Sequence, residues 1–123
     1  MIFKITGETP SKKNSRINTR SGKSFPNKKY TAWAADAVAQ LMEQKRPCVP
    51  IDCPIKLSVN FFHADNVRRD SDNQLSSVLD VLQDAGILAD DRWQIVQAIN
   101  VRNFKADLSW CEIAISELKG END

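Results

Sequence analysis

The sequence predicts a single α+β domain over residues 1–123, with a small mixed β-sheet, two helices packed against it and the element order β-α-β-α-β-β. Two observations predict this class. Apolar residues alternate with polar ones in several stretches, as in half-buried strands, and recur at three- and four-residue steps in two others, as in amphipathic helices. The length of 123 residues, 41% of them hydrophobic and 27% charged, suits one globular unit with a modest core.

A first strand and a basic loop are predicted at the start of the chain. Met1 to Thr6 alternates weakly and ends before turn-forming residues. Residues 11–29 hold few apolar side chains, so we expect an extended or mobile loop. No acidic residue lies between Glu8 and Asp36, so the loop is a candidate for phosphate contact, with a merely solvated basic loop as the alternative. Seven of the 17 basic residues fall here, namely Lys12, Lys13, Arg16, Arg20, Lys23, Lys28 and Lys29.

A first helix is predicted from Tyr30 until Pro47 ends the segment. Its apolar face is expected to pack in the core, and this includes Trp33, although an exposed tryptophan could also stack on a nucleic-acid base. The positions on this face are Tyr30, Trp33, Ala34, Ala37, Val38, Leu41 and Met42.

The clearest strand pattern runs from Ile55 to Phe61, where four apolar residues alternate with polar ones. His63 follows closely, and a lone histidine at a strand end is expected to be structural or exposed rather than a metal ligand. The loop after it leads to the most acidic part of the chain. A functional loop presented by a strand end is a common arrangement.

A second helix is predicted from about Asp72 to Ala85, and Gly86 is well placed as its left-handed stop. Its buried stripe is expected to consist of Leu75, Val78, Leu79, Leu82 and Ala85. The opposite face carries Asp72, Ser76 and Asp80.

Two further strands are predicted at Gln94–Phe104 and Trp110–Leu118, with a turn near Ala106 and Asp107. Because only a short turn separates them, we expect them to pair as a hairpin.

Composition excludes several classes of protein. No apolar run approaches the roughly 20 residues of a membrane span, and the first residues lead into a strand rather than a signal peptide, so we expect a cytoplasmic protein. The three cysteines are an odd number without a Cys-x-x-Cys pair, so neither a disulfide framework nor a zinc ribbon is predicted.

Four carboxylates flank the second predicted helix, with Asp70 and Asp72 before it and Asp90 and Asp91 after it. A helix cap explains one of them but not all four. Hard cations such as Mg²⁺ prefer oxygen ligands, which Asp70, Asp72 and one of the later pair could supply. A calcium EF-hand loop starting at Asp70 is excluded, because it would need Gly at its sixth and Glu at its twelfth position.

This pattern resembles the RusA family of Holliday junction resolvases. The similarity is carried by Arg69-Asp70-Ser71-Asp72-Asn73, Leu79-Asp80, Leu82, Ala85-Gly86 and Asp90-Asp91. The resemblance implies a homodimeric, Mg²⁺-dependent endonuclease of phage or prophage origin, with Mn²⁺ as a possible substitute. Such an enzyme nicks four-way and other branched DNA symmetrically and leaves 5′-phosphate ends.

The resemblance also implies roles for individual residues. The three essential carboxylates of the family fall on Asp70, Asp72 and Asp91, and Asp90 would be an auxiliary metal ligand. Arginine forks suit phosphate oxygens, so Arg68 and Arg69 are expected to hold neighbouring phosphates. The further expected DNA contacts are Lys12, Lys13, Arg16 and Arg20.

One position departs from the family pattern. The family commonly has a lysine four residues after the second catalytic aspartate, where this chain has Ser76, and a hydroxyl cannot supply a positive charge to the attacked phosphate. Three outcomes follow: another cation serves, turnover is slow, or the chain binds branched DNA without cutting it. The candidate cations are Arg68, Arg69, Arg92, Lys12 and Lys13. A structural protein with capping and surface acids is the remaining alternative.

Overall fold

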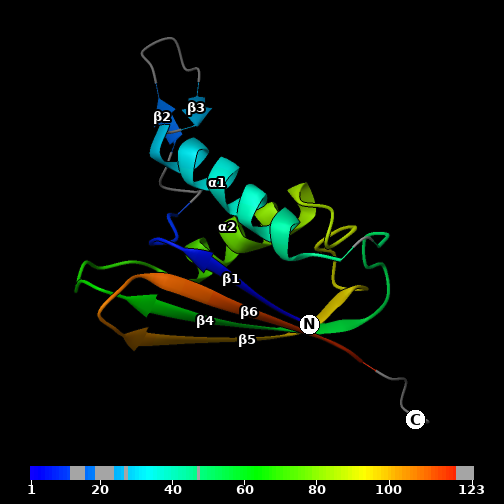
Figure 1. Cartoon of the computed structure of the whole chain (residues 1–123). Helices are drawn as coiled ribbons and strands as arrows, with labels where there is room; N and C mark the ends of the chain where they lie inside the picture. Colours follow the sequence, from blue (N-terminus) through cyan, green and yellow to red (C-terminus); the bar gives the residue numbers. More distant parts are fainter. Residues whose placement is uncertain (12–15, 19–23, 27, 47, 119–123) are drawn as a thin grey trace.

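A computed structural model of the chain describes residues 1–11, 16–18, 24–26, 28–46 and 48–118. The helices lie on one face of a four-stranded sheet, and a two-stranded ribbon stands beyond the start of α1 (Figure 1). The elements are β1 (Ile2–Thr6), β2 (Arg16–Asn18), β3 (Ser24–Pro26), α1 (Lys28–Gln44), β4 (Ile55–His63), α2 (Ser71–Asp84), β5 (Val96–Lys105) and β6 (Trp110–Glu117). This confirms the predicted α+β class. The ribbon of β2 and β3 corrects the prediction of an extended or mobile loop over residues 11–29.

The four-stranded sheet has the order β1-β6-β4-β5. β6 runs antiparallel to both β1 and β4, whereas β5 runs parallel to β4. As a result β1, β4 and β5 all point the same way and end on the same edge of the sheet.

The predicted hairpin of the last two strands is wrong, because β4 lies between β5 and β6. Helix α2 returns the chain to the edge where β4 begins, so β5 must run parallel to β4. β6 alternates buried and half-buried residues along most of its length, as a central strand does, while β5 is exposed along most of its length, as an edge strand is. The short connection between them crosses one strand, a step of about 10 Å.

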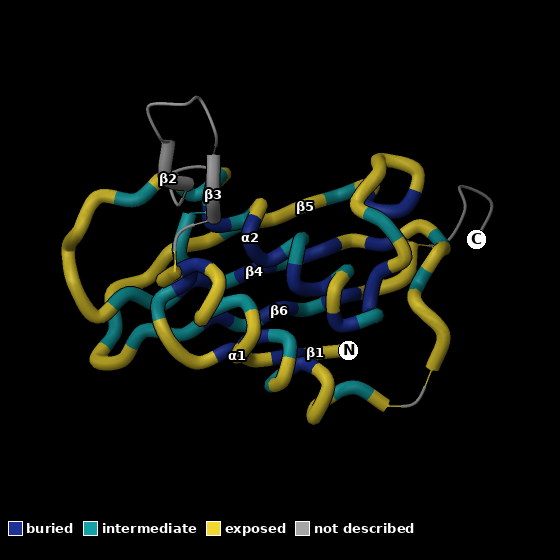
Figure 2. Tube along the Cα trace, turned by 90° about the horizontal axis from the view of Figure 1, so that it is seen from above, coloured by how far each residue is buried: buried dark blue, intermediate teal, exposed yellow. Residues whose placement is uncertain are grey.

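The core lies between the helices and the sheet. Figure 2 marks its buried residues along both helices and along β1, β4 and β6. The four apolar residues predicted for β4 are all buried, and the strand continues two residues beyond the prediction to His63. The same face of β6 contributes three more buried side chains. In order, these seven are Ile55, Leu57, Val59, Phe61, Cys111, Ile113 and Ile115. None of the described helices has the length and apolar character needed to cross a membrane.

Helix α1 buries the face that its periodicity predicts, with Tyr30, Ala37 and Leu41 inside the protein. Trp33 packs against the core, in agreement with the prediction. Met42 is an exception at 57% exposure.

The predicted buried stripe of α2 is confirmed at Val78, Leu82 and Ala85, but the buried face is centred closer to Gln74 and Ser77 than predicted. Gln74 and Ser77 are buried, whereas Leu75 and Leu79 are only partly buried. The polar residues are satisfied by the segment after β1: Gln74 Nε2 donates to the carbonyl of Thr9 at 2.7 Å, and Ser77 Oγ donates to that of Pro10 at 2.7 Å. Gly86 ends the helical region at a φ of 74°, the left-handed conformation predicted for it.

A hydrogen bond joins the two helices. Tyr30 Oη donates to Asp80 Oδ2 at 2.9 Å, and burial together with this bond raises the pKa of the tyrosine hydroxyl. Asp80, part of the family-like motif, therefore has a structural partner.

Tyr30→Phe tests this link. Removing the hydroxyl leaves the partly buried Asp80 carboxylate without one donor, so we expect the free energy of unfolding to fall by about 1–2 kcal/mol. Urea denaturation measures the change, and Met42→Leu on the exposed side of α1 is a control expected to stay within about 0.5 kcal/mol of wild type. Equal stability of Tyr30→Phe and wild type would contradict the role of the bond.

Candidate metal and phosphate site

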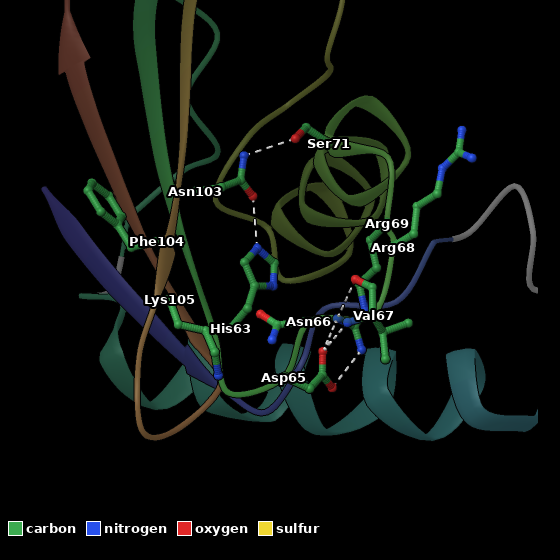
Figure 3. A pocket seen from close by; sticks show the side chains of 10 residues that line it. All are labelled: His63, Asp65, Asn66, Val67, Arg68, Arg69, Ser71, Asn103, Phe104 and Lys105. Atoms are coloured by element: carbon green, nitrogen blue, oxygen red, sulfur yellow. Dashed lines mark hydrogen bonds and ion pairs between the residues drawn. The ribbon is translucent and has the colours of Figure 1, made fainter.

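The start of α2 lies at the edge where β4 and β5 end. A cavity of about 390 Å³ opens there, between the loop after β4 and the end of β5 (Figure 3). Its lining includes His63, Asp65, Arg68, Arg69, Ser71, Asn103 and Lys105. Mostly basic and polar side chains therefore lie around the start of α2, next to Asp70 and Asp72.

The first pair of predicted metal ligands lies at this end of α2. Asp70 occupies the N-cap position with an extended backbone, φ −91° and ψ 124°, but its side chain makes no capping hydrogen bond. The capping interpretation therefore fails for Asp70. Asp72 is exposed in the first turn. Neither carboxylate is hydrogen-bonded or ion-paired to the part of the chain that the structure describes, so both are available to a ligand.

The second pair lies at the opposite end of α2. The helix has 14 residues, which corresponds to about 21 Å, and the chain then pairs beside Ile51, ahead of β4, before it reaches Asp90 and Asp91. Asp90 Oδ1 accepts the backbone N–H of Asp91 at 2.8 Å, and Asp90 Oδ2 lies 3.6 Å from Arg92 Nη1. Asp91 is exposed.

The geometry does not bring all the predicted ligands together within one chain. Among the described residues, no three His, Cys, Asp or Glu side chains lie close enough to hold one metal ion. Asp70 and Asp72 are neighbours on the first turn, and Asp90 and Asp91 are neighbours beyond the last. The predicted site made of Asp70, Asp72 and Asp91 stays a prediction.

The two arginines before α2 differ in their partners. Arg69 grips Asp65 with both terminal nitrogens, Nη1 to Oδ1 at 2.6 Å and Nη2 to Oδ2 at 3.0 Å, and also lies 3.4 Å from Glu8. These hydrogen bonds lower the pKa of Asp65 to about 2. Arg68 is exposed and makes no bond within the described part of the chain, and its side chain extends away from the loop (Figure 3). Arg68 is thus the arginine free to bind a phosphate.

The remaining predicted DNA contacts fall mostly outside the described residues. Lys12, Lys13 and Arg20 are not among them, and for Arg16 the structure describes only the backbone, in β2. Their roles stay predictions. Ser76, the position that departs from the family pattern, is exposed on α2.

Glu8 is a site residue that sequence reasoning missed. Its carboxylate accepts hydrogen bonds from Gln74 Nε2 at 3.0 Å and Ser109 Oγ at 3.3 Å, and contacts His63 Nδ1 at 2.9 Å. It follows the end of β1 just as His63 ends β4. Only the strand pairing shows that β1 and β4, which lie on either side of β6, end at the same edge of the sheet.

His63 lies at the end of β4, as predicted, between two hydrogen-bond acceptors. Nδ1 faces Glu8 at 2.9 Å, and Nε2 faces Asn103 Oδ1 at 2.8 Å. Both ring nitrogens can donate only in the imidazolium form. Partial burial lowers the pKa of His63, but the bonds to Asn103 and Glu8 and the charge of Glu8 outweigh it, so the pKa is raised above its ordinary value.

Comparison with known proteins agrees with this motif. The family described as Endodeoxyribonuclease RusA matches residues 7–116. The chain belongs to the RusA family. A relative of known name, the crossover junction endodeoxyribonuclease RusA of Aquifex aeolicus (strain VF5), is 34% identical over 80 residues, which cover 65% of this chain and 63% of that protein. The matched part of this RusA-family chain thus spans less than two thirds of the length of that relative.

The raised pKa of His63 predicts how stability depends on pH. Since the folded-state pKa lies above the unfolded value of about 6.5, the stabilisation is fully present below that value and is lost as the pH rises through the folded-state pKa. The difference in unfolding free energy between wild type and His63→Gln should therefore be larger at about pH 6 than at about pH 9. Urea denaturation across this range measures it. A difference that grows with pH would contradict the imidazolium assignment.

Proposed function

We propose that this chain is a metal-dependent endonuclease that resolves Holliday junctions by paired symmetrical nicks in DNA recombination and repair. Two unpaired carboxylates, Asp70 and Asp72, beside a cationic cavity in a RusA-family chain are the observation that carries the proposal. The name of the Aquifex aeolicus relative, a crossover junction endodeoxyribonuclease, supports the same substrate. A cytoplasmic location in a bacterial cell, with a phage or prophage gene as the source, goes with this function.

Mg²⁺ is the proposed cofactor, with Mn²⁺ as a substitute. The residues fit such an ion in chemistry, because Asp70, Asp72 and Asp91 are exposed carboxylates whose oxygens make no bond within the described residues. Asp90 would assist, although one of its oxygens is held by the Asp91 amide. Bound Mg²⁺ supplies such sites with charge neutralisation at the phosphate and with water of lowered pKa.

Two copies of the chain would complete each metal site. Asp91 lies beyond the far end of a helix about 21 Å long, so its carboxylate reaches the ligands of the first turn only if a second chain presents it. A homodimer with twofold symmetry would then contain two equivalent sites. Two such sites suit paired symmetrical nicks in a four-way junction.

The cations around the site would hold the DNA backbone. Arg68 is free to grip a phosphate next to the scissile one, and its position two residues before Asp70 makes it the best replacement for the family lysine. Arg69 stays a predicted contact, although it already holds Asp65 and Glu8. Lys12, Lys13, Arg16 and Arg20 would add sequence-independent phosphate contacts.

A branched-DNA-binding module with weak or lost catalysis is the second candidate. It is favoured by Ser76, which is exposed at a position where the family commonly places a cation. The two candidates share the DNA surface and differ in turnover alone.

Cleavage assays with Asp72→Asn test the proposal. We expect wild type to nick mobile-core and immobile-core four-way junctions, but not linear duplex, when Mg²⁺ or Mn²⁺ is present and not with a chelator. Asp72→Asn should lose about 10²-fold or more in rate yet bind junctions as well or better, because it removes a negative charge. Glu43→Gln, which removes the same charge from α1, is the matched control. Tight binding without nicks in every metal would support the binding module instead.

Mixing two inactive variants tests the shared metal site. A mixed dimer contains one Asp72→Asn chain and one Asp91→Asn chain. If the sites are shared, one of its two sites takes Asp70 and Asp72 from the Asp91→Asn chain and Asp91 from the Asp72→Asn chain, so this site keeps all three carboxylates. When equal amounts of the two chains reassort at random, about half of the dimers are mixed and each has one intact site, so we expect nicking of single strands at about a quarter of the wild-type number of sites. Sites built within single chains would both be defective in this mixture. No recovery, in a mixture shown to contain mixed dimers, would contradict the shared site.

A further inference from the structure

We propose that a hydrogen-bonded chain of Glu8, His63, Asn103 and Ser71 positions the first turn of α2, and with it the carboxylates of Asp70 and Asp72. This inference rests on the proposed function, because it assigns those carboxylates to the reaction. The four residues are positioning residues: they act through the helix and not on the phosphate.

The chain of bonds joins four separate segments at one edge of the sheet. Glu8, after β1, contacts His63 Nδ1 at 2.9 Å, and His63, at the end of β4, contacts Asn103 Oδ1 at 2.8 Å. Asn103, on β5, donates from Nδ2 to Ser71 Oγ at 2.9 Å. Figure 3 shows the last two links, from His63 through Asn103 to the start of α2. This series of hydrogen bonds therefore ends at Ser71, the residue between Asp70 and Asp72.

The first turn of α2 needs this outside support. A helix start has N–H groups without partners inside the helix, and a capping side chain usually orders them. Here Asp70 makes no such cap. Its carbonyl accepts from the N–H groups of Asn73 and Gln74, both at 3.2 Å, which is the long end of the range for such bonds. The bond from Asn103 to Ser71 fixes the turn while the carboxylates stay free.

A second branch from Glu8 holds the other side of the same turn. Gln74, only 1% exposed, donates to Glu8 at 3.0 Å and to the carbonyl of Thr9 at 2.7 Å. The first turn is thus tied to β5 through Ser71 and to the segment after β1 through Gln74. The Glu8 carboxylate takes part in both sets of hydrogen bonds, through His63 in one and through Gln74 in the other.

The donors and acceptors along this series of hydrogen bonds fix the orientation of the Asn103 amide. His63 donates to the Asn103 carbonyl oxygen, which turns the amide nitrogen toward Ser71. If the amide were reversed, two N–H groups would face each other at His63. A proton on Nε2 of His63 therefore directs the Asn103 oxygen to the histidine and the Asn103 nitrogen to Ser71, at the start of α2.

The test uses Ser71→Ala, Asn103→Ala and the double variant in single-turnover nicking of a four-way junction with Mg²⁺. A small misplacement of catalytic groups has a large effect on rate, so each single variant should nick about tenfold more slowly, with junction Kd within about twofold of wild type. Because both residues serve one bond, the double variant should be no slower than either single variant.

Two further variants separate positioning from a general loss of structure. Ser71→Thr keeps the hydroxyl acceptor and should restore the wild-type rate. Asn100→Ala changes an exposed asparagine on the opposite face of β5 and should have no effect. Wild-type rates in both single variants, or rate losses in the double variant that multiply, would overturn the proposal.

Amide hydrogen exchange supplies a readout that needs neither DNA nor activity. The N–H groups of Asn73 and Gln74 should exchange about fivefold faster in Asn103→Ala and Ser71→Ala than in wild type or Asn100→Ala. If wild type nicks no junction in any metal, the proposed function fails, and faster exchange would still establish the support of the first turn. Unchanged exchange would overturn the positioning role whatever the activity.

Discussion

The pairing of β6 between β1 and β4 is the constraint on which the site depends. β6 is antiparallel to both neighbours, so β1 and β4 run in the same direction and end at one edge of the sheet. The crossover through α2 adds β5 in that direction as well. Glu8 follows β1, His63 ends β4 and Asn103 lies near the end of β5, so the three residues meet only because of this arrangement.

Polar residues of α2 other than its first two aspartates anchor the helix to the rest of the protein. Gln74 and Ser77 face inward and bond to backbone carbonyls of the segment after β1, at the expense of apolar packing on two buried positions. Asp70 and Asp72 face outward without partners in the described chain. Ordering the helix start through Ser71 rather than through an aspartate cap keeps negative charge available for a cation.

The cations near the start of α2 differ in whether the described part of the chain supplies them with an acidic partner. Arg69 is bound to Asp65 and Glu8, which shapes the loop from the end of β4 to α2. The imidazolium of His63 is likewise enclosed by Glu8 and Asn103. Arg68 is left exposed beside Asp70. Arg69 and His63 thus offset the charges of Glu8, which is partly buried, and of Asp65, which is exposed. Arg68 faces the region where a phosphate would lie in the proposed function.

The sequence by itself predicted the elements other than the β2–β3 ribbon, and it singled out the carboxylates of the proposed site. The alternation at Ile55–Phe61, the helical steps from Tyr30 and Gly86 as a left-handed stop all reflect local preferences, and the structure confirms them. Asp70 and Asp72 could be found for the same reason, since a motif is a local pattern. The spacing of Asp90 and Asp91 was equally visible.

Only the tertiary structure decided how these parts meet. Strand order depends on contacts far apart in the chain, so the expected hairpin of the last two strands gave way to a central β4. Gln74 could be assigned to the interior only once Thr9 was known to lie beside it, because a buried amide requires partners. The same is true of Glu8 and His63, which are 55 residues apart and meet where two parallel strands end.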